Sequence, residues 1–383
     1  MQSLFICFIA PFLSILACLL IAKLVYNSSH FESIFLRNAR FGSLDGIRGY
    51  LAIFVLFHHF IIVYGWQKEG FWGETQYRLF NNFGKVSVAI FFMITGFLFI
   101  AKITQKKVNW LQLYKSRLFR IMPLYLFSVA IISFVVFTAT NFALTTDLIT
   151  LMKQYTKWLL FFGGNINGFD QTNLVIAGVE WTLKFEWFFY LSLPFIATAI
   201  TRLKTIGVAI LIILSVLAYT HSVSMFVLTS VISSKYIIFF CFGGIASYIY
   251  KKYNDQIEFD NVKLSFFNLT ILLVALLYPH TYDIFHILII FLFFIVSALG
   301  NDLFGLFSKR SSILLGEISY SIYLLHGAVL FFVFKLYPII EFKSYTLSEY
   351  FVFMPMISVI VILLSVVTFL TIEKPFIKLG SKL

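Results

Sequence analysis

Long apolar runs separated by short polar segments make up most of the chain. Eleven of these runs approach the roughly 20 residues that an α-helix needs to cross the hydrocarbon core of a bilayer. They lie at residues 3–22, 47–64, 84–101, 121–139, 181–200, 206–221, 235–250, 264–279, 284–300, 313–336 and 351–372. The pattern therefore predicts an all-α fold, a polytopic transmembrane helix bundle of about 11 helices.

Composition and charge support this prediction and set the orientation. Of the 383 residues, 60% are hydrophobic and 12% are charged, whereas soluble domains average about 45–50% and about 25%. The net charge of +12 does not indicate a nucleic-acid partner, because the basic residues lie in short loops beside apolar runs. If the N-terminus faces outward, 20 of the 29 Lys and Arg lie in inward loops, which predicts a cytosolic C-terminus.

The first apolar run is expected to be a retained helix. It lacks the basic segment and the small-residue cleavage site of a signal peptide. The longest outward loop runs from Asn141 to Glu180 and contains a turn-rich stretch at residues 163–168. The seven His are scattered without the spacing of metal ligands, so we expect no metal.

Ionisable residues inside the apolar runs point to a site, because each costs at least about 2.5–3.5 kcal/mol at a bilayer centre. Arg48 and His59 are eleven residues apart, which places them on one helical face about 16 Å apart along the axis. Asp45 neighbours Arg48 at i, i+3. An imidazole suits proton abstraction from a hydroxyl near neutral pH. The alternative is that Arg48 reaches the headgroups and His59 only packs, as we expect for His58.

Three further clusters carry polar residues into the bundle. Arg117 and Arg120 form an i, i+3 pair that could grip phosphates or anchor the helix at the membrane surface. Glu186 follows Trp181 at the outer end of a run and could orient an imidazole, bind an acceptor hydroxyl or pair with Lys184. The last cluster aligns Ser319, Tyr323 and His326 on one face, and inter-helix hydrogen bonding alone would also explain it.

Taken together, these segments resemble the membrane-bound acyltransferase-3 family. The resemblance rests on five segments in order along residues 43–375: 44–49 followed by His59, 91–98, 117–125, 181–190 and 319–326. It implies a ten-helix core in residues 43–375, with an extra N-terminal helix and cytosolic loop at 1–42 and a cytosolic tail at 376–383. The chain ends at Leu383, so we expect no C-terminal esterase-like domain; a separate periplasmic partner or a homo-oligomer then stays open.

The resemblance also implies an activity and roles for residues. Such enzymes move an acyl group, usually acetyl, from cytosolic acyl-CoA to a hydroxyl of a surface glycan, in the bacterial inner membrane. Residues matching Arg48 and His59 are required for transfer, and those matching Arg117 and Arg120 are associated with CoA. We expect acetyl-CoA as a donor substrate and no permanently bound cofactor.

A mechanism follows from these expectations. His59 would act as the base, Arg48, Asp45 and Glu186 would assist, and the acceptor would lie near Trp181, Glu186, Tyr323 and His326. Direct attack on the thioester and an acyl-imidazole intermediate both stay open. The alternative function is a proton-coupled transporter or glycan-lipid flippase, with His59 and Glu186 as a proton relay.

Overall fold

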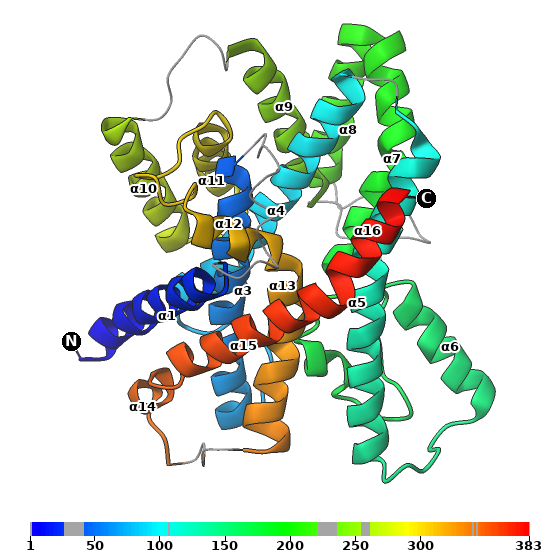
Figure 1. Ribbon diagram of the computed structural model, residues 1–383, viewed down its shortest axis with the longest axis vertical. Helices are drawn as coiled ribbons and strands as arrows, with labels where there is room; N and C mark the ends of the chain where they lie inside the picture. Colours follow the sequence, from blue (N-terminus) through cyan, green and yellow to red (C-terminus); the bar gives the residue numbers. More distant parts are fainter. Residues whose placement is uncertain are drawn as a thin grey trace.

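The computed structural model of the protein describes residues 2–26, 42–105, 108–220, 236–253, 261–338, 341 and 344–382. In these ranges every regular element is a helix (Figure 1). The elements are α1 (Gln2–Tyr26), α3 (Gly42–Glu69), α4 (Arg78–Gln105), α5 (Trp110–Ala139), α6 (Leu148–Leu159), η1 (Thr172–Ile176), α7 (Trp181–Arg202), α8 (Lys204–Thr220), α9 (Ile237–Tyr253), α10 (Val262–Leu277), α11 (Ile284–Ala298), α12 (Arg310–Glu317), α13 (Ser319–Phe331), η3 (Phe332–Leu336), α14 (Leu347–Phe351), α15 (Met354–Thr368), η4 (Phe369–Glu373) and α16 (Lys374–Lys382).

The predicted all-α polytopic bundle is confirmed. Each of the apolar runs predicted from the sequence overlaps a helix. In the described ranges, seven helical segments are long and apolar enough to cross a membrane, and three shorter apolar helices accompany them. The chain is therefore a multi-pass integral membrane protein.

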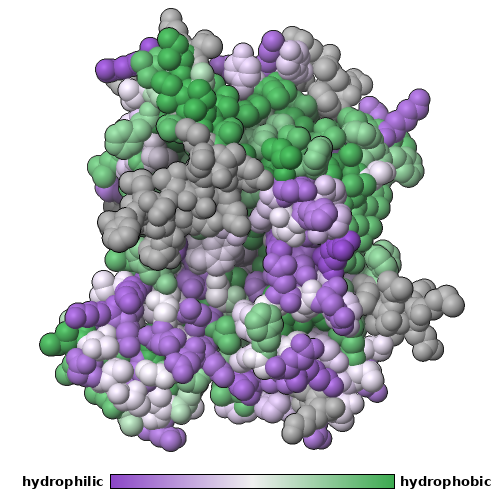
Figure 2. All heavy atoms as spheres, turned by 180° about the vertical axis from the view of Figure 1, so that it is seen from behind, coloured by the Kyte–Doolittle hydropathy of each residue, from purple (hydrophilic) through white to green (hydrophobic). Residues whose placement is uncertain are grey.

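Helices α3, α4 and α13 form the centre of the bundle (Figure 1). The apolar stretches of α3 and α4 are 78% and 72% buried, whereas those of α1 and α7 are each 28% buried. Exposed apolar side chains such as Phe12, Leu24 and Phe195 cover the peripheral helices. Figure 2 shows broad hydrophobic areas over the upper part of one face. In a bilayer, lipid tails cover such surfaces, so the polar residues of the central helices are the ones that need a functional explanation.

Glycines let the central helices approach closely. A Cβ at Gly316 of α12 would lie 1.7 Å from the backbone oxygen of Asp45 in α3. A Cβ at Gly243 of α9 would lie 2.1 Å from the backbone oxygen of Met93 in α4. Without a side chain at these positions, the backbones touch, as is typical of membrane helix packing. These contacts hold α3 and α4 in place, and both helices carry polar side chains into the interior of the bundle.

The segment from Asn141 to Glu180 is folded rather than an open loop. Asn167 is fully buried, and its side chain donates to the Ala143 carbonyl at 2.8 Å. A Cβ at Gly327 of α13 would lie 2.3 Å from the Ile176 backbone, so η1 packs on α13. Glu180 ends the segment with only 5% exposure, and burial raises its pKa to about 7. Through η1 this segment packs against α13 and α5 and leads directly into α7.

Candidate active site

Two cavities lie between α3, α4, α7 and α13. Helices α3 and α4 pack side by side. They run antiparallel, because the earlier part of α3 lines the same cavity as the later part of α4, and the later part of α3 lines the same cavity as the earlier part of α4. The first, here called the arginine cavity, has a volume of about 160 Å³ and includes Arg48 and Thr95 in its lining. The second, the histidine cavity, has a volume of about 350 Å³ and includes His59 and Lys85. Arg48 and His59, which are eleven positions apart on α3, therefore line two different cavities rather than the same one.

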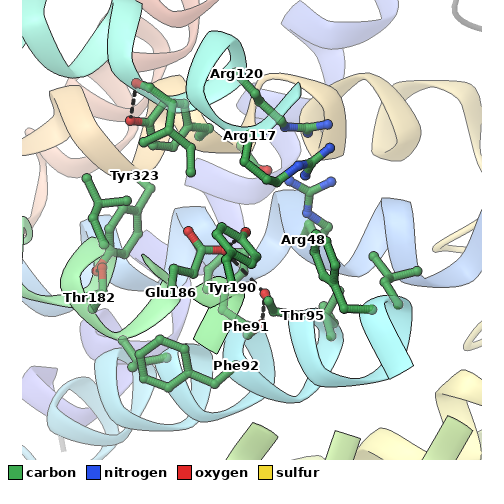
Figure 3. Close-up of a pocket in the computed structure, with 18 residues that line it drawn as sticks. Arg48, Phe91, Phe92, Thr95, Arg117, Arg120, Thr182, Glu186, Tyr190 and Tyr323 are labelled. Carbon is green, nitrogen blue, oxygen red and sulfur yellow. Dashed lines mark hydrogen bonds between the residues drawn. The ribbon is translucent and has the colours of Figure 1, made fainter. Parts of the chain in front are cut away.

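Three guanidinium groups meet at the arginine cavity. Arg48 comes from the start of α3, whereas Arg117 and Arg120 come from the first third of α5. Figure 3 shows the three side chains with their nitrogen atoms turned toward the same region. The Arg117 guanidinium also lies over the Phe99 ring, 5.4 Å from its centroid. The i, i+3 spacing on α5 thus brings both of its arginines to Arg48.

Within the described residues, these guanidinium groups form no ion pair with a carboxylate. Among the described residues, no carboxylate oxygen lies within 4.0 Å of a nitrogen of Arg48, Arg117 or Arg120. Charges held in a low-dielectric interior are normally paired, because desolvation is costly. Three half-buried cations in one cavity favour the binding of an anion, and guanidinium groups match the geometry of phosphate.

Glu186 faces the same cavity from α7. Its Oε1 accepts hydrogen bonds from the Tyr190 hydroxyl at 2.9 Å and from the Thr95 hydroxyl at 3.3 Å (Figure 3). It has no hydrogen bond to His59 or His326 within the described part of the chain. Glu186 thus belongs to the wall opposite the arginines, where its second oxygen stays available to accept a hydrogen bond from a ligand.

Polar and aromatic side chains together line the histidine cavity. Lys85 pairs with Glu74 at 2.5 Å and donates to the Thr281 hydroxyl at 3.1 Å. The Glu74 side chain is 61% exposed, so this wall reaches the protein surface. Trp181 and Tyr236 contribute neighbouring rings with centroids 4.9 Å apart. Such a mixture of flat apolar faces and hydrogen-bonding groups suits a polar organic ligand.

His59 and His326 are hydrogen-bonded to each other across the bundle. Nδ1 of His59 lies 2.9 Å from Nε2 of His326 and 3.1 Å from the Val55 carbonyl oxygen. Nδ1 of His326 lies 3.1 Å from the Ile322 carbonyl oxygen. His326 is fully buried and lies behind His59, outside the lining of either cavity.

This network assigns the tautomers of both rings. A carbonyl oxygen only accepts, so Nδ1 of His326 carries a proton and its Nε2 is the acceptor. The single proton on Nδ1 of His59 is therefore shared between Nε2 of His326 and the Val55 carbonyl oxygen. In the neutral ring Nε2 of His59 carries no proton, and it has no hydrogen-bond partner among the described residues. Since His59 lines the histidine cavity, this ring has the form of a general base.

His58 lies closer to the site than its helical direction suggested. Its ring centroid is 4.8 Å from that of His59, and it lines the same cavity. Its Nδ1 donates to the Phe80 carbonyl at 3.0 Å. A Cβ at Gly84 would lie 2.4 Å from the His58 ring, so α4 can approach here only because residue 84 is glycine. Unlike His59, His58 has no hydrogen bond to another imidazole within the described residues.

The remaining residues singled out from the sequence are separated by the fold. Tyr323 lines both cavities, and its hydroxyl lies 2.9 Å from that of Thr182. Trp181 lines the histidine cavity and Glu186 the arginine cavity, although they are only five positions apart on α7. Asp45 lines neither cavity and has no hydrogen bond or ion pair to Arg48 among the described residues.

Sequence analysis missed several residues of the histidine cavity. Lys85 had a detectable signal, because a cation near the end of an apolar run is a candidate functional residue. Glu74, Tyr236 and Tyr282 had none, since they lie outside or at the ends of the apolar runs and reach the cavity only through packing. No group of three or more His, Cys, Asp or Glu in the described residues could hold a metal ion.

Comparison with known proteins gives one family. A family model described as an acyltransferase domain matches residues 41–370, which is most of the chain. Comparison with curated proteins and with solved structures gives no match. The match covers the helices that build both cavities, from α3 to the start of η4. This protein is therefore a membrane acyltransferase, a member of the acyltransferase-3 family.

Proposed function

We propose that the protein transfers an acyl group, most simply acetyl, from acyl-CoA to a hydroxyl of a surface glycan. The observation that carries this proposal is the meeting of three guanidinium groups, none ion-paired with a carboxylate among the described residues, beside a cavity lined by the His59 imidazole. CoA carries several phosphate charges and a long flexible arm that ends in the thioester. Arg48, Arg117 and Arg120 fit the phosphates, and the arm extends toward the histidine cavity.

The acceptor is proposed to occupy the histidine cavity. Aromatic faces at Trp181 and Tyr236 suit the apolar faces of a sugar ring, and Lys85, Glu74 and Thr281 offer hydrogen bonds to its hydroxyls. In this arrangement Glu186 accepts from the amide groups of the CoA arm rather than from the acceptor. The acceptor class is consistent with an opening at the protein surface near Glu74.

The proposed reaction is a direct transfer. Nε2 of His59 takes the proton of the acceptor hydroxyl while the hydroxyl oxygen attacks the thioester carbonyl carbon. The C–S bond then breaks, and the CoA thiolate takes the proton from the His59 imidazolium. The products are an ester and CoA with its thiol restored. His326 stabilises the transient imidazolium through the hydrogen bond at Nδ1 of His59.

Orientation in the bacterial inner membrane is part of the proposal. The excess of Lys and Arg in alternate loops supports a cytosolic C-terminus and an outward N-terminus. Arg117 and Arg120 then lie near the cytosolic face, where acyl-CoA is made, and the histidine cavity lies toward the outer face. Transfer would thus join a cytosolic donor to an outward acceptor.

The test uses membranes from a deletion strain that carries each variant, permeabilised and supplied with [¹⁴C]acetyl-CoA. Wild type is expected to place label in alkali-labile esters of the glycan fraction. His59→Ala is expected to lower the rate by about 10²–10⁴, and His58→Ala by less. Unchanged transfer in His59→Ala at normal protein level would remove His59 as the base, and a larger loss in His58→Ala would transfer that role to His58.

A second arm tests the phosphate site. Charge reversal of Arg117 and Arg120 to Glu is expected to weaken CoA binding to the purified protein by at least about tenfold, since each lost charge-assisted contact is worth about 1.5–3 kcal/mol. Lys115→Glu is the matched control, because Lys115 lies on α5 but lines neither cavity. Equal CoA affinity in the Arg117 and Arg120 variant and in this control would contradict the proposal, as would a wild type that leaves acetyl-CoA unconsumed.

A further inference from the structure

The two cavities share a wall made by Val88 of α4 and Tyr323 of α13. Both residues belong to the lining of the arginine cavity and to that of the histidine cavity. Each is 9% exposed, so little of either side chain is open to solvent. Any group that passes from one cavity to the other must pass this pair, here called the partition.

The partition is stiff on its tyrosine side. The Thr182 hydroxyl donates its single proton to the Val179 carbonyl at 3.0 Å. The contact of 2.9 Å between Thr182 and Tyr323 therefore has the Tyr323 hydroxyl as donor. The Tyr323 ring also packs edge-on against Phe91, with centroids 6.0 Å apart. A hydrogen bond at one end and a ring contact along the side hold this side chain in place.

The partition is stiff on its valine side as well. Val88 is β-branched, and such a side chain has one strongly preferred rotamer in a helix. It lies on α4 between Lys85 of the histidine cavity and Thr95 of the arginine cavity. Helix α4 is itself fixed against α9 by the close approach at Gly243. The spacing between Val88 and Tyr323 is therefore fixed by the packing of α4 and α13.

We propose that Val88 and Tyr323 set the size of the acyl group that the enzyme transfers. This inference rests on the proposed function, since the thioester of a donor held by Arg48 must meet the acceptor oxygen beside His59 at the partition. There an acetyl group packs a single methyl group against the partition. Each added methylene meets the Val88 isopropyl group and the Tyr323 ring, and discrimination by one methylene in a fitted apolar site is about 10–200-fold.

The experiment compares acyl-CoA donors of increasing length in one set of membranes. Permeabilised membranes with wild type, Val88→Ala or Val88→Phe receive labelled acetyl-, propionyl- or butyryl-CoA, and kcat/KM is measured from alkali-labile label. Val88→Ala is expected to raise the butyryl-to-acetyl ratio by about tenfold or more. Val88→Phe is expected to lower acetyl transfer while CoA binding is kept, because the arginines are untouched.

A matched valine serves as the control. Val86 is also buried in α4, at 1% exposure, but lines neither cavity. Val86→Ala is expected to keep the wild-type ratio, so any general loosening of α4 is separated from widening of the partition. If the butyryl-to-acetyl ratio of Val88→Ala equals that of Val86→Ala, the inference is overturned. Acetyl transfer by wild type in the same experiment would still leave the proposed function intact. Absence of transfer from every donor in wild type would instead refute the proposed function.

Discussion

Replacement of His326 tests the network behind the proposed base. In His326→Leu the hydrogen bond of 2.9 Å to Nδ1 of His59 is lost. The contact of 3.1 Å from the same nitrogen to the Val55 carbonyl remains, so His59 keeps its tautomer. What the variant loses is support for the imidazolium that forms during transfer. His326 acts as a positioning residue, because it lines neither cavity.

The size of the effect follows from this single lost contact. A hydrogen bond to a charged group contributes about 1.5–3 kcal/mol. Since 1.36 kcal/mol of barrier is a factor of ten in rate, we expect kcat to fall by about 10–150-fold. The KM for acetyl-CoA should change little, because the donor phosphates bind in the other cavity. His326→Gln should recover part of the loss, since its amide oxygen can accept from His59.

The assay is steady-state transfer of label from acetyl-CoA in His326→Leu, His326→Gln, His59→Ala and the double variant of His59 and His326. If His326 acts only through His59, the double variant is no slower than His59→Ala alone. Losses that multiply in the double variant would show an independent role for His326. A rise in KM without a fall in kcat would place His326 in substrate binding, and either outcome would refute the reasoning.

Two further predictions concern stability, measured as thermal unfolding in detergent. Burial raises the Glu180 pKa from 4.5 to about 7, so the folded state binds the extra proton and stability should fall by up to about 3 kcal/mol as pH rises through that window. Glu180→Gln should lose this slope, and a flat wild-type profile would contradict the assignment. Gly316→Ala should destabilise by at least about 1–3 kcal/mol, because its Cβ would meet the Asp45 backbone at 1.7 Å. Gly65→Ala is the control, with its nearest atom at 3.8 Å, and equal unfolding temperatures in both variants would refute the packing argument.

The sequence determined the positions of the helices and the directions of some side chains. Lipid solvation demands long apolar helices, so each apolar run predicted from the sequence overlaps a helix, although the run at 313–336 is divided into α12, α13 and η3. The helical repeat also placed Arg117 beside Arg120, and both line one cavity. These properties depend on residues close together in the chain, and local spacing is sufficient to predict them.

Tertiary structure decided how those side chains combine. The partner of His59 is His326, 267 residues away, and no spacing within one helix gives that pairing. Packing also placed Arg48 and His59 on opposite sides of a partition that Val88 and Tyr323 form. Glu186 joined the arginine cavity while Trp181 lines the other. The physical reason is that a helical repeat fixes the direction of a side chain, whereas close glycine contacts between helices fix what lies opposite it.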